Sequence, residues 1–121
     1  MKAYVDVNVL YYFLTANGEF GERAKELLER YSGRLITSAL TVWQLHILFR
    51  RQKAKVDIAD ILPNLGIEVV PLTFDILREA ERCEKLDFDD AIHYTTMKVH
   101  GVRTILSSDR DFDRMDVKRI F

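Results

Sequence analysis

The sequence predicts an α/β protein in which a parallel β-sheet lies between two layers of helices. Short β-rich runs alternate with helical patterns along the whole chain, and no repeat or low-complexity segment interrupts their order. Each connection between parallel strands needs a crossover helix, which this alternation supplies. The 121 residues have 48% hydrophobic content, enough to bury one core. We therefore expect a single domain over residues 1–121, built as a three-layer α/β/α sandwich.

The first half of the chain contains two predicted strands and three predicted helices. "KAYVDV" (2–7) has the composition of a strand, "NVLYYFLT" then turns helical, and "ERAKELLERYSG" is an amphipathic helix with Gly33 beyond its end. "RLITS" (34–38) is the second strand. The helix "LTVWQLHILFRR" that follows is so apolar that we expect protein to cover much of its surface.

The next segment repeats the alternation. "KVDIADILPNL" is a predicted helix that Pro63 bends or ends, and "IEVVP" (67–71) is the third predicted strand. Thr73 is placed to cap a helix that we expect to run to about Leu86.

The last part of the chain supplies the remaining elements of the predicted sheet. A helix is expected from about Asp89 to His100, where Gly101 stops it. "RTILSS" (103–108) is the fourth predicted strand, "DRDFDRM" a short helical turn, and "VKRI" (117–120) the fifth strand.

Composition limits the classes of function. Eighteen basic and nineteen acidic residues give a formal net charge of −1, so any binding to nucleic acid must rely on local patches. Cys83 is the single cysteine, which excludes an internal disulfide and a zinc site built from cysteines. The start "MKAYVDVNVL" does not have the form of a signal peptide, and no apolar run approaches the ~20 residues that cross a bilayer. We expect a cytoplasmic protein without a membrane partner.

Several aspartates fall where a parallel sheet would bring them together. Asp6 lies near the carboxyl end of the first strand, Asp109 just past the end of the fourth, and Asp89 and Asp90 open a helix. Ligands of open α/β sheets bind beyond the carboxyl ends of the strands, and neighbouring carboxylates repel one another unless a cation neutralises them. Mg²⁺ or Mn²⁺, which prefer oxygen ligands, are the natural cofactors of such a crevice.

A structural explanation competes with this one. Aspartates at a helix start are common N-caps that favour the positive end of the helix dipole, so "DFDDA" or "SSDRDFD" alone would be read as capping. Asp89 is the residue that we expect to cap, with Asp87 preceding the helix. In "VDVNVL", however, a carboxylate ends a buried strand, and burial of a lone carboxylate costs several kcal/mol. The three segments together favour a functional site.

These segments resemble a known family. "VDVNVL", "DDAIHYTTMKVHG" and "ILSSDRDFD" look like the first, third and fourth motifs of the PIN domain, a nuclease fold that includes the toxins of VapBC toxin–antitoxin pairs. The resemblance implies a five-stranded parallel sheet, a Mg²⁺ or Mn²⁺ site, and cleavage of single-stranded RNA. By motif, it implies Asp6, Asp90 and Asp109 as catalytic metal ligands, with Asn8 and Ser107 as polar supports.

One motif departs from the family pattern. The glutamate expected in the helix after the second strand is replaced by Gln44, and no acidic residue lies between Glu29 and Asp57. Gln44 can accept a hydrogen bond or coordinate weakly through its oxygen, so we keep it as a supporting residue. The missing charge leaves two functions open: a metal-dependent endoribonuclease, or a catalytically weakened PIN-fold protein that binds RNA or protein.

Other polar residues leave alternatives open. Asp113 is counted among the supporting residues, although a solvated turn explains at least one of Asp111 and Asp113. His93 lies three residues after Asp90, the spacing of a metal-binding pair, but a single copy more often means a histidine bonded to a neighbour. "RRQKAK" (50–55) either holds RNA phosphates or simply places cations at a helix C-terminus.

Partners follow from the apolar helices and from the resemblance. "VLYYFL" and "VWQLHILF" carry more apolar surface than one small domain readily hides, so we expect a homodimer, and the likeness to toxins adds an antitoxin protein as a second partner. Two other α/β classes do not fit. A phosphoacceptor domain would need an acidic pair after the first strand and a late lysine, and a DxD phosphatase would need an aspartate where Asn8 stands.

Overall fold

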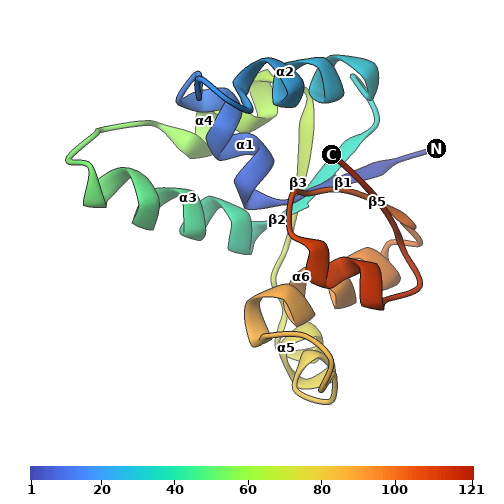
Figure 1. The fold of residues 1–121 in the computed structure, drawn as a ribbon. Helices are drawn as coiled ribbons and strands as arrows, with labels where there is room; N and C mark the ends of the chain where they lie inside the picture. Colours follow the sequence, from blue (N-terminus) through green and yellow to red (C-terminus); the bar gives the residue numbers. More distant parts are fainter.

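Five parallel strands form one sheet in the computed structural model, which describes residues 1–121 (Figure 1). In chain order the strands are β1 (Ala3–Val5), β2 (Leu35–Ser38), β3 (Ile67–Val70), β4 (Thr104–Leu106) and β5 (Lys118–Ile120). Their order in the sheet is β3-β2-β1-β4-β5, and every neighbouring pair is parallel. The fourth strand therefore pairs directly with the first, with Tyr4 opposite Ile105.

Six α-helices and a short 3₁₀ helix connect the strands. They are α1 (Val7–Leu14), α2 (Gly21–Arg30), α3 (Ala39–Arg51), α4 (Ile58–Asn64), α5 (Phe74–Ala80), α6 (Phe88–Val99) and the 3₁₀ helix η1 (Arg110–Arg114). None of the helices combines the length and the apolar character that crossing a membrane requires.

The two faces of the sheet carry separate hydrophobic cores. Alternate residues of a strand point to opposite faces, so Ala3 and Val5 of β1 pack with residues of α1 to α4, whereas Tyr4 packs with residues of α5 and α6. Figure 1 shows the same division, with α1, α2 and α4 on one side of the sheet and α5 and α6 on the other. The predicted α/β/α sandwich is confirmed.

Helix α3 begins beside the sheet and projects away from it (Figure 1). Ser38 caps it by accepting a hydrogen bond from the Leu40 backbone N–H, 3.0 Å away. Leu45 and Phe49 are buried in the core, as the apolar sequence predicts, but Trp43 is 61% exposed. The covered face of α3 is thus accounted for within the domain, and an exposed aromatic ring remains on another face.

The helix predicted from Thr73 to about Leu86 is wrong beyond Ala80. Thr73 does cap it, accepting a hydrogen bond from the Ile76 backbone N–H at 3.2 Å, but α5 ends at Ala80 in tight turns. Leu86 is buried, only 8% exposed, among residues of α6 and the sheet. The chain must leave the helical path to place Leu86 there and to reverse direction into α6, so burial overrides the local helical preference.

The predicted cap of the next helix is also wrong. Helix α6 begins at Phe88, so the N-cap position belongs to Asp87, whose side chain makes no capping hydrogen bond. Asp89 lies in the first turn and accepts a hydrogen bond from Gln44 of α3. The end of the helix agrees with the prediction, because Gly101 follows it in the left-handed conformation, with φ of +67°.

Candidate metal centre and active site

Asp6 lies at the carboxyl end of the central strand β1 and is 2% exposed. Its Oδ1 accepts a hydrogen bond from the Val7 backbone N–H at 2.8 Å, so the same carboxylate caps α1. The chain can bury this charged group because hydrogen-bond donors surround it. Asp6 is therefore held in one position at the edge of the sheet where ligands of this fold class bind.

Asn8 and Ser107 join the end of β1 to the end of β4. The Ser107 hydroxyl donates to Asp6 Oδ2 at 2.6 Å, and the Asn8 side-chain amide donates to the same oxygen at 3.0 Å. Ser107 Oγ also accepts from the Asp109 backbone N–H, and Asn8 Oδ1 accepts from the Ser108 backbone N–H, both at 3.0 Å. These bonds fix the loop that carries Asp109 relative to Asp6.

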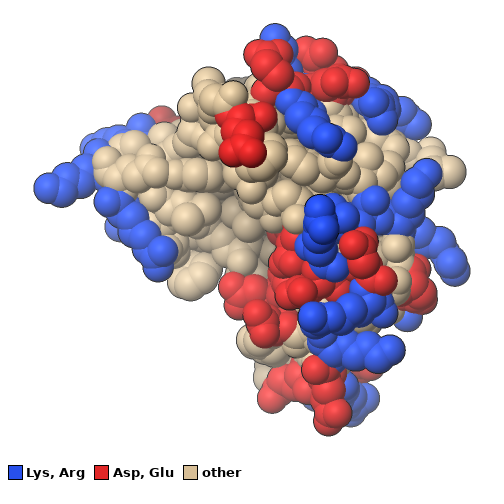
Figure 2. Space-filling view, viewed as in Figure 1, with Lys and Arg blue, Asp and Glu red and all other residues tan.

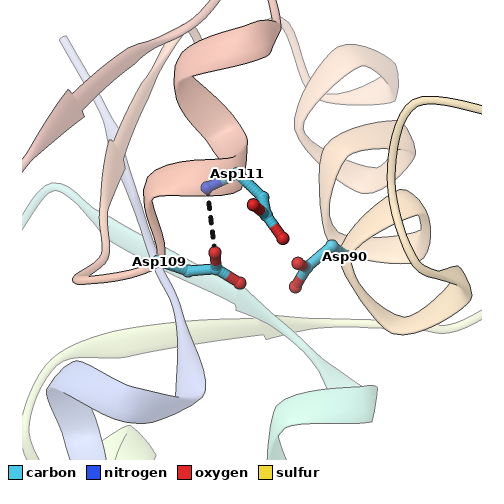
Figure 3. Close-up of side chains that lie close together, drawn as sticks. All are labelled: Asp90, Asp109 and Asp111. Atoms are coloured by element: carbon cyan, nitrogen blue, oxygen red, sulfur yellow. Dashed lines mark hydrogen bonds between the residues drawn. The ribbon is translucent and has the colours of Figure 1, made fainter.

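Three carboxylates converge above this loop (Figure 3). Asp90 comes from the first turn of α6, and Asp109 and Asp111 come from the start of η1. One oxygen from each lies within 4.8 Å of the others. Asp109 Oδ1 accepts a hydrogen bond from the Asp111 backbone N–H at 2.9 Å, which turns both side chains toward Asp90.

This convergence changes the protonation of Asp90. Burial raises the pKa of Asp90 to about 8, helped by a hydrogen bond to Asp109 and by the negative charges of Asp6, Asp109 and Asp111. A carboxyl group with this pKa keeps its proton near neutral pH unless a cation replaces it. The arrangement therefore favours a bound positive charge.

Replacing Asp90 with Asn is expected to reduce the pH dependence of stability in chelator. Because the folded state binds the Asp90 proton more tightly than the unfolded state, the contribution of Asp90 to stability falls as pH rises from about 4 to about 8. Asp90→Asn removes this contribution. Thermal melts between about pH 5 and about pH 8 measure it. If stability changes with pH equally in wild type and Asp90→Asn, the raised pKa of Asp90 is contradicted. Asp60→Asn on α4 is the matched control.

Gln44 does not point its oxygen into the carboxylate cluster. Its side-chain NH₂ donates to Asp89 Oδ2 at 3.1 Å, and its Oε1 lies 2.9 Å from His93 Nε2. Since a carboxylate only accepts, the amide orientation is fixed and His93 Nε2 carries the hydrogen that Gln44 accepts. His93 Nδ1 then accepts from the Tyr4 hydroxyl at 2.5 Å. Burial and the charge of Asp6 raise the pKa of Tyr4, which keeps that hydroxyl a donor.

His93 is fully buried, and its Nε2 lies 3.8 Å from Asp6 Oδ1. Burial lowers its pKa, against the opposing charges of Asp6 and Asp89. Both ring nitrogens are hydrogen-bonded within the protein, to Tyr4 and Gln44. The spacing of His93 from Asp90 thus corresponds here to a histidine bonded to its neighbours.

The other predicted site residues divide into two groups. Asp6, Asn8, Ser107 and Asp109 are linked by hydrogen bonds, and Asp90 lies against Asp109. Asp113 lies apart from them, because both of its carboxylate oxygens accept from Arg119, at 2.9 and 3.2 Å, which lowers its pKa.

Sequence reasoning left Asp111 undecided and missed the link from Tyr4 through His93 to Gln44. The residues of that link are too far apart in sequence for any spacing rule to join them. The ligand atoms that Asp90, Asp109 and Asp111 offer to a metal are all carboxylate oxygens, which fit a hard divalent cation such as Mg²⁺ or Mn²⁺.

Comparison with known structures identifies the fold. VapC20 of Mycobacterium tuberculosis, described as a sarcin-ricin loop cleaving toxin, has a TM-score of 0.82 and 21% identity, covering 97% of this chain and 99% of its own. A toxin–antitoxin complex from Klebsiella pneumoniae has a TM-score of 0.77 and 18% identity, covering 99% and 97%. FitAcB from Neisseria gonorrhoeae has a TM-score of 0.67 and 18% identity, covering 98% and 96%. At these identities the likeness establishes a shared fold.

Sequence comparison identifies the family. Among curated protein sequences, none matches this chain significantly. The family model of the PIN domain, in contrast, matches residues 3–118, nearly the whole chain. This match spans Asp6, Asp90 and Asp109, together with all the strands that position them. The chain therefore belongs to the PIN domain family of nucleases.

Proposed function

We propose that this protein is a metal-dependent endoribonuclease that cuts single-stranded RNA, with Asp6, Asp90 and Asp109 as catalytic metal ligands. The observation that carries the proposal is the convergence of Asp90, Asp109 and Asp111, with the pKa of Asp90 raised to about 8. Asp6 lies outside this trio, but Ser107 links it to Asp109, and its charge acts on Asp90. Arg114 pairs with Asp111 at 3.3 Å on the solvent side, but no cationic side chain pairs with Asp90 or Asp109. A divalent cation with a phosphodiester would neutralise the remaining negative charge.

The residues of the chain contribute mainly by orientation. Asn8 and Ser107 hold the Asp6 carboxylate in one position by donating hydrogen bonds to Oδ2, and Asp109 is fixed through its backbone N–H. Asp90 would have to give up its proton to bind a cation. A divalent ion held by these carboxylates would supply Lewis acidity toward a phosphodiester and lower the pKa of a bound water. Asp111 adds a further carboxylate oxygen on the same side.

Gln44 gives specific support to a second candidate, a weakened PIN-fold protein that binds RNA or protein. Its oxygen accepts from His93 and its NH₂ donates to Asp89, so the side chain brings neither a charge nor a free ligand atom to the cluster. The two candidates differ in one measurable property, because only the first predicts hydrolysis when metal is supplied.

The deciding experiment is incubation of the pure protein with a labelled single-stranded RNA in Mn²⁺, in Mg²⁺ and in chelator. Internal cuts that appear with metal and disappear in chelator are expected from the nuclease. Intact RNA across all metal concentrations, together with retained RNA binding, would favour the second candidate. The same RNA annealed to its complement measures the preference for single strands.

We further infer that the protein acts as the toxin of a toxin–antitoxin pair and forms a homodimer in the cytoplasm. Support comes from the solved relatives, which include a toxin–antitoxin complex, and from the exposed apolar residues Phe74 on α5 and Val99 on α6. Light scattering at micromolar concentration tests the homodimer, and a monomer would refute it. An antitoxin encoded beside this protein would distinguish a toxin from a nuclease with another role.

A further inference from the structure

Two exposed aromatic residues are sequence neighbours of the pair whose hydrogen bond joins α3 to α6. Trp43 immediately precedes Gln44 and is 61% exposed, and Phe88 immediately precedes Asp89 and is 47% exposed. Consecutive Cα atoms are about 3.8 Å apart, so the Cα atoms of both aromatic residues lie next to those of the residues that make this bond. Asp90, in the carboxylate cluster, is two residues from Phe88. The backbone that carries both rings therefore lies at the edge of the proposed active site.

Neither ring has a partner within the chain. Trp43 donates no hydrogen bond, and neither Trp43 nor Phe88 stacks on another aromatic ring or lies against a cation. By contrast, the guanidinium of Arg78 lies over the exposed ring of Phe74 on α5, 6.0 Å from the ring centroid. Large exposed aromatic surfaces at the edge of a site are typical of recognition.

Two arginines lie further along α3 than Trp43. Arg50 follows Trp43 by seven residues and Arg51 follows Gln44 by seven, so each arginine lies on the same helix face two turns further on. Two turns span about 10 Å, the rise of about three stacked nucleotides. Both arginines are exposed and neither forms an ion pair. In Figure 2, Lys and Arg side chains gather at the projecting end of α3, and a hollowed neutral surface separates them from acidic side chains.

We propose that Trp43 and Phe88 stack on unpaired bases of an RNA whose backbone runs from the carboxylate cluster toward Arg50 and Arg51. The proposal rests on the nuclease function proposed above and adds the groups that would distinguish single strands from duplexes. An unpaired base offers its π face to a ring, whereas in a duplex that face is covered by neighbouring bases. Phosphates on either side would meet the bound cation at one end and the arginines at the other.

Trp43 is the single tryptophan of the chain, so intrinsic fluorescence reports directly on it. Titration with a short mixed-sequence single-stranded RNA is made in Ca²⁺, a hard cation that fills oxygen sites, with RNA integrity checked on a gel. Quenching of the Trp43 emission by the single strand, and much less by the same RNA annealed to its complement, is the expected result. Equal quenching by the duplex would overturn the stacking assignment.

Variants distinguish stacking of a base on an aromatic ring from simple apolar contact. Trp43→Leu is expected to weaken binding of labelled single-stranded RNA about 10-fold to 100-fold by anisotropy, while Trp43→Phe retains most of the affinity. Phe88→Leu should weaken binding in the same direction. Phe74→Leu is the matched control, because Phe74 follows the edge strand β3, two strands from β1, and should bind like wild type.

The outcomes distinguish this inference from the proposed function. Unchanged affinity of Trp43→Leu, with wild type still cutting RNA in Mn²⁺, overturns the stacking and leaves the nuclease standing. RNA that is never cut, with affinity still lost in Trp43→Leu, overturns the nuclease alone. Emission of Trp43 that changes with protein concentration in the absence of RNA shows that a second copy covers the ring, and this too overturns the proposal.

Discussion

Asp6→Asn is expected to lower RNA cleavage in Mn²⁺ by about 100-fold or more, equivalent to about 2.7 kcal/mol of transition-state stabilisation. The substitution removes one negative charge from the proposed cation site but keeps the shape of a side chain that is 2% exposed. The new amide oxygen can still accept from the Val7 backbone N–H, and the Ser107 hydroxyl can rotate to accept from the new NH₂ group, so the cost is mainly the hydrogen bond that the Asn8 NH₂ group donates to Asp6. The fold should therefore survive while metal affinity and activity are lost.

Two controls make the result interpretable. Asp60→Asn, at an exposed position in the first turn of α4, removes the same charge far from the crevice and should cut RNA like wild type. Asp113→Asn removes a carboxylate that pairs with Arg119, so a small effect would agree with its place outside the cluster. If Asp6→Asn and wild type cleave at the same rate, with circular dichroism showing both folded, Asp6 has no role in catalysis.

Gln44→Glu is expected to destabilise the metal-free protein by about 1–2 kcal/mol relative to wild type. Mn²⁺ is expected to narrow or reverse this difference in stability. The Gln44 NH₂ lies 3.1 Å from Asp89 Oδ2, so a glutamate there places like charges in contact. Coulomb repulsion between two unit charges about 4 Å apart amounts to about 1 kcal/mol in water and about 4 kcal/mol near a protein surface. Asp89 is exposed to solvent, so the lower value is the better guide. In a domain of this size the melting temperature falls by about 4 °C for each kcal/mol.

The response of the melting temperature to Mn²⁺ shows whether the new carboxylate points toward the metal site. Metal that binds only the folded state stabilises it by about 1.4 kcal/mol per tenfold gain in affinity when metal is in excess. If the glutamate joins the cluster, Mn²⁺ should raise the melting temperature of Gln44→Glu more than that of wild type, and RNA cleavage should rise as well. An identical Mn²⁺ response in both proteins would show that position 44 does not reach the metal.

A second substitution tests the contact itself. An asparagine at position 89 can donate a hydrogen bond to a glutamate at position 44, so adding Asp89→Asn to Gln44→Glu should recover most of the lost stability in chelator. Asp89→Asn alone leaves Gln44 with an acceptor and should be nearly neutral. A double variant no more stable than Gln44→Glu would mean that the repulsion comes from other carboxylates, such as Asp6 or Asp90.

The sequence by itself determined the alternation of strands and helices, and with it the α/β/α sandwich. It also indicated which aspartates would lie at the carboxyl edge of the sheet, because a parallel sheet brings the ends of all its strands to one side. Asp6 follows β1 and Asp109 follows β4, and the pairing of these two strands makes the aspartates neighbours. Local patterns suffice for such features because each depends on a few consecutive residues.

Only the tertiary structure decided how the remaining polar groups are used. Asp111 and Asp113 are equivalent by local pattern, yet Asp111 turns toward Asp90 while one of its oxygens pairs with Arg114, whereas both oxygens of Asp113 are held by Arg119. Gln44 reads as a weakened ligand in sequence, but contacts with Asp89 and His93, residues 45 and 49 positions away, direct its amide elsewhere. These choices depend on which side chains the packing of α3, α6 and η1 brings into contact, and burial then requires that each polar atom find a partner.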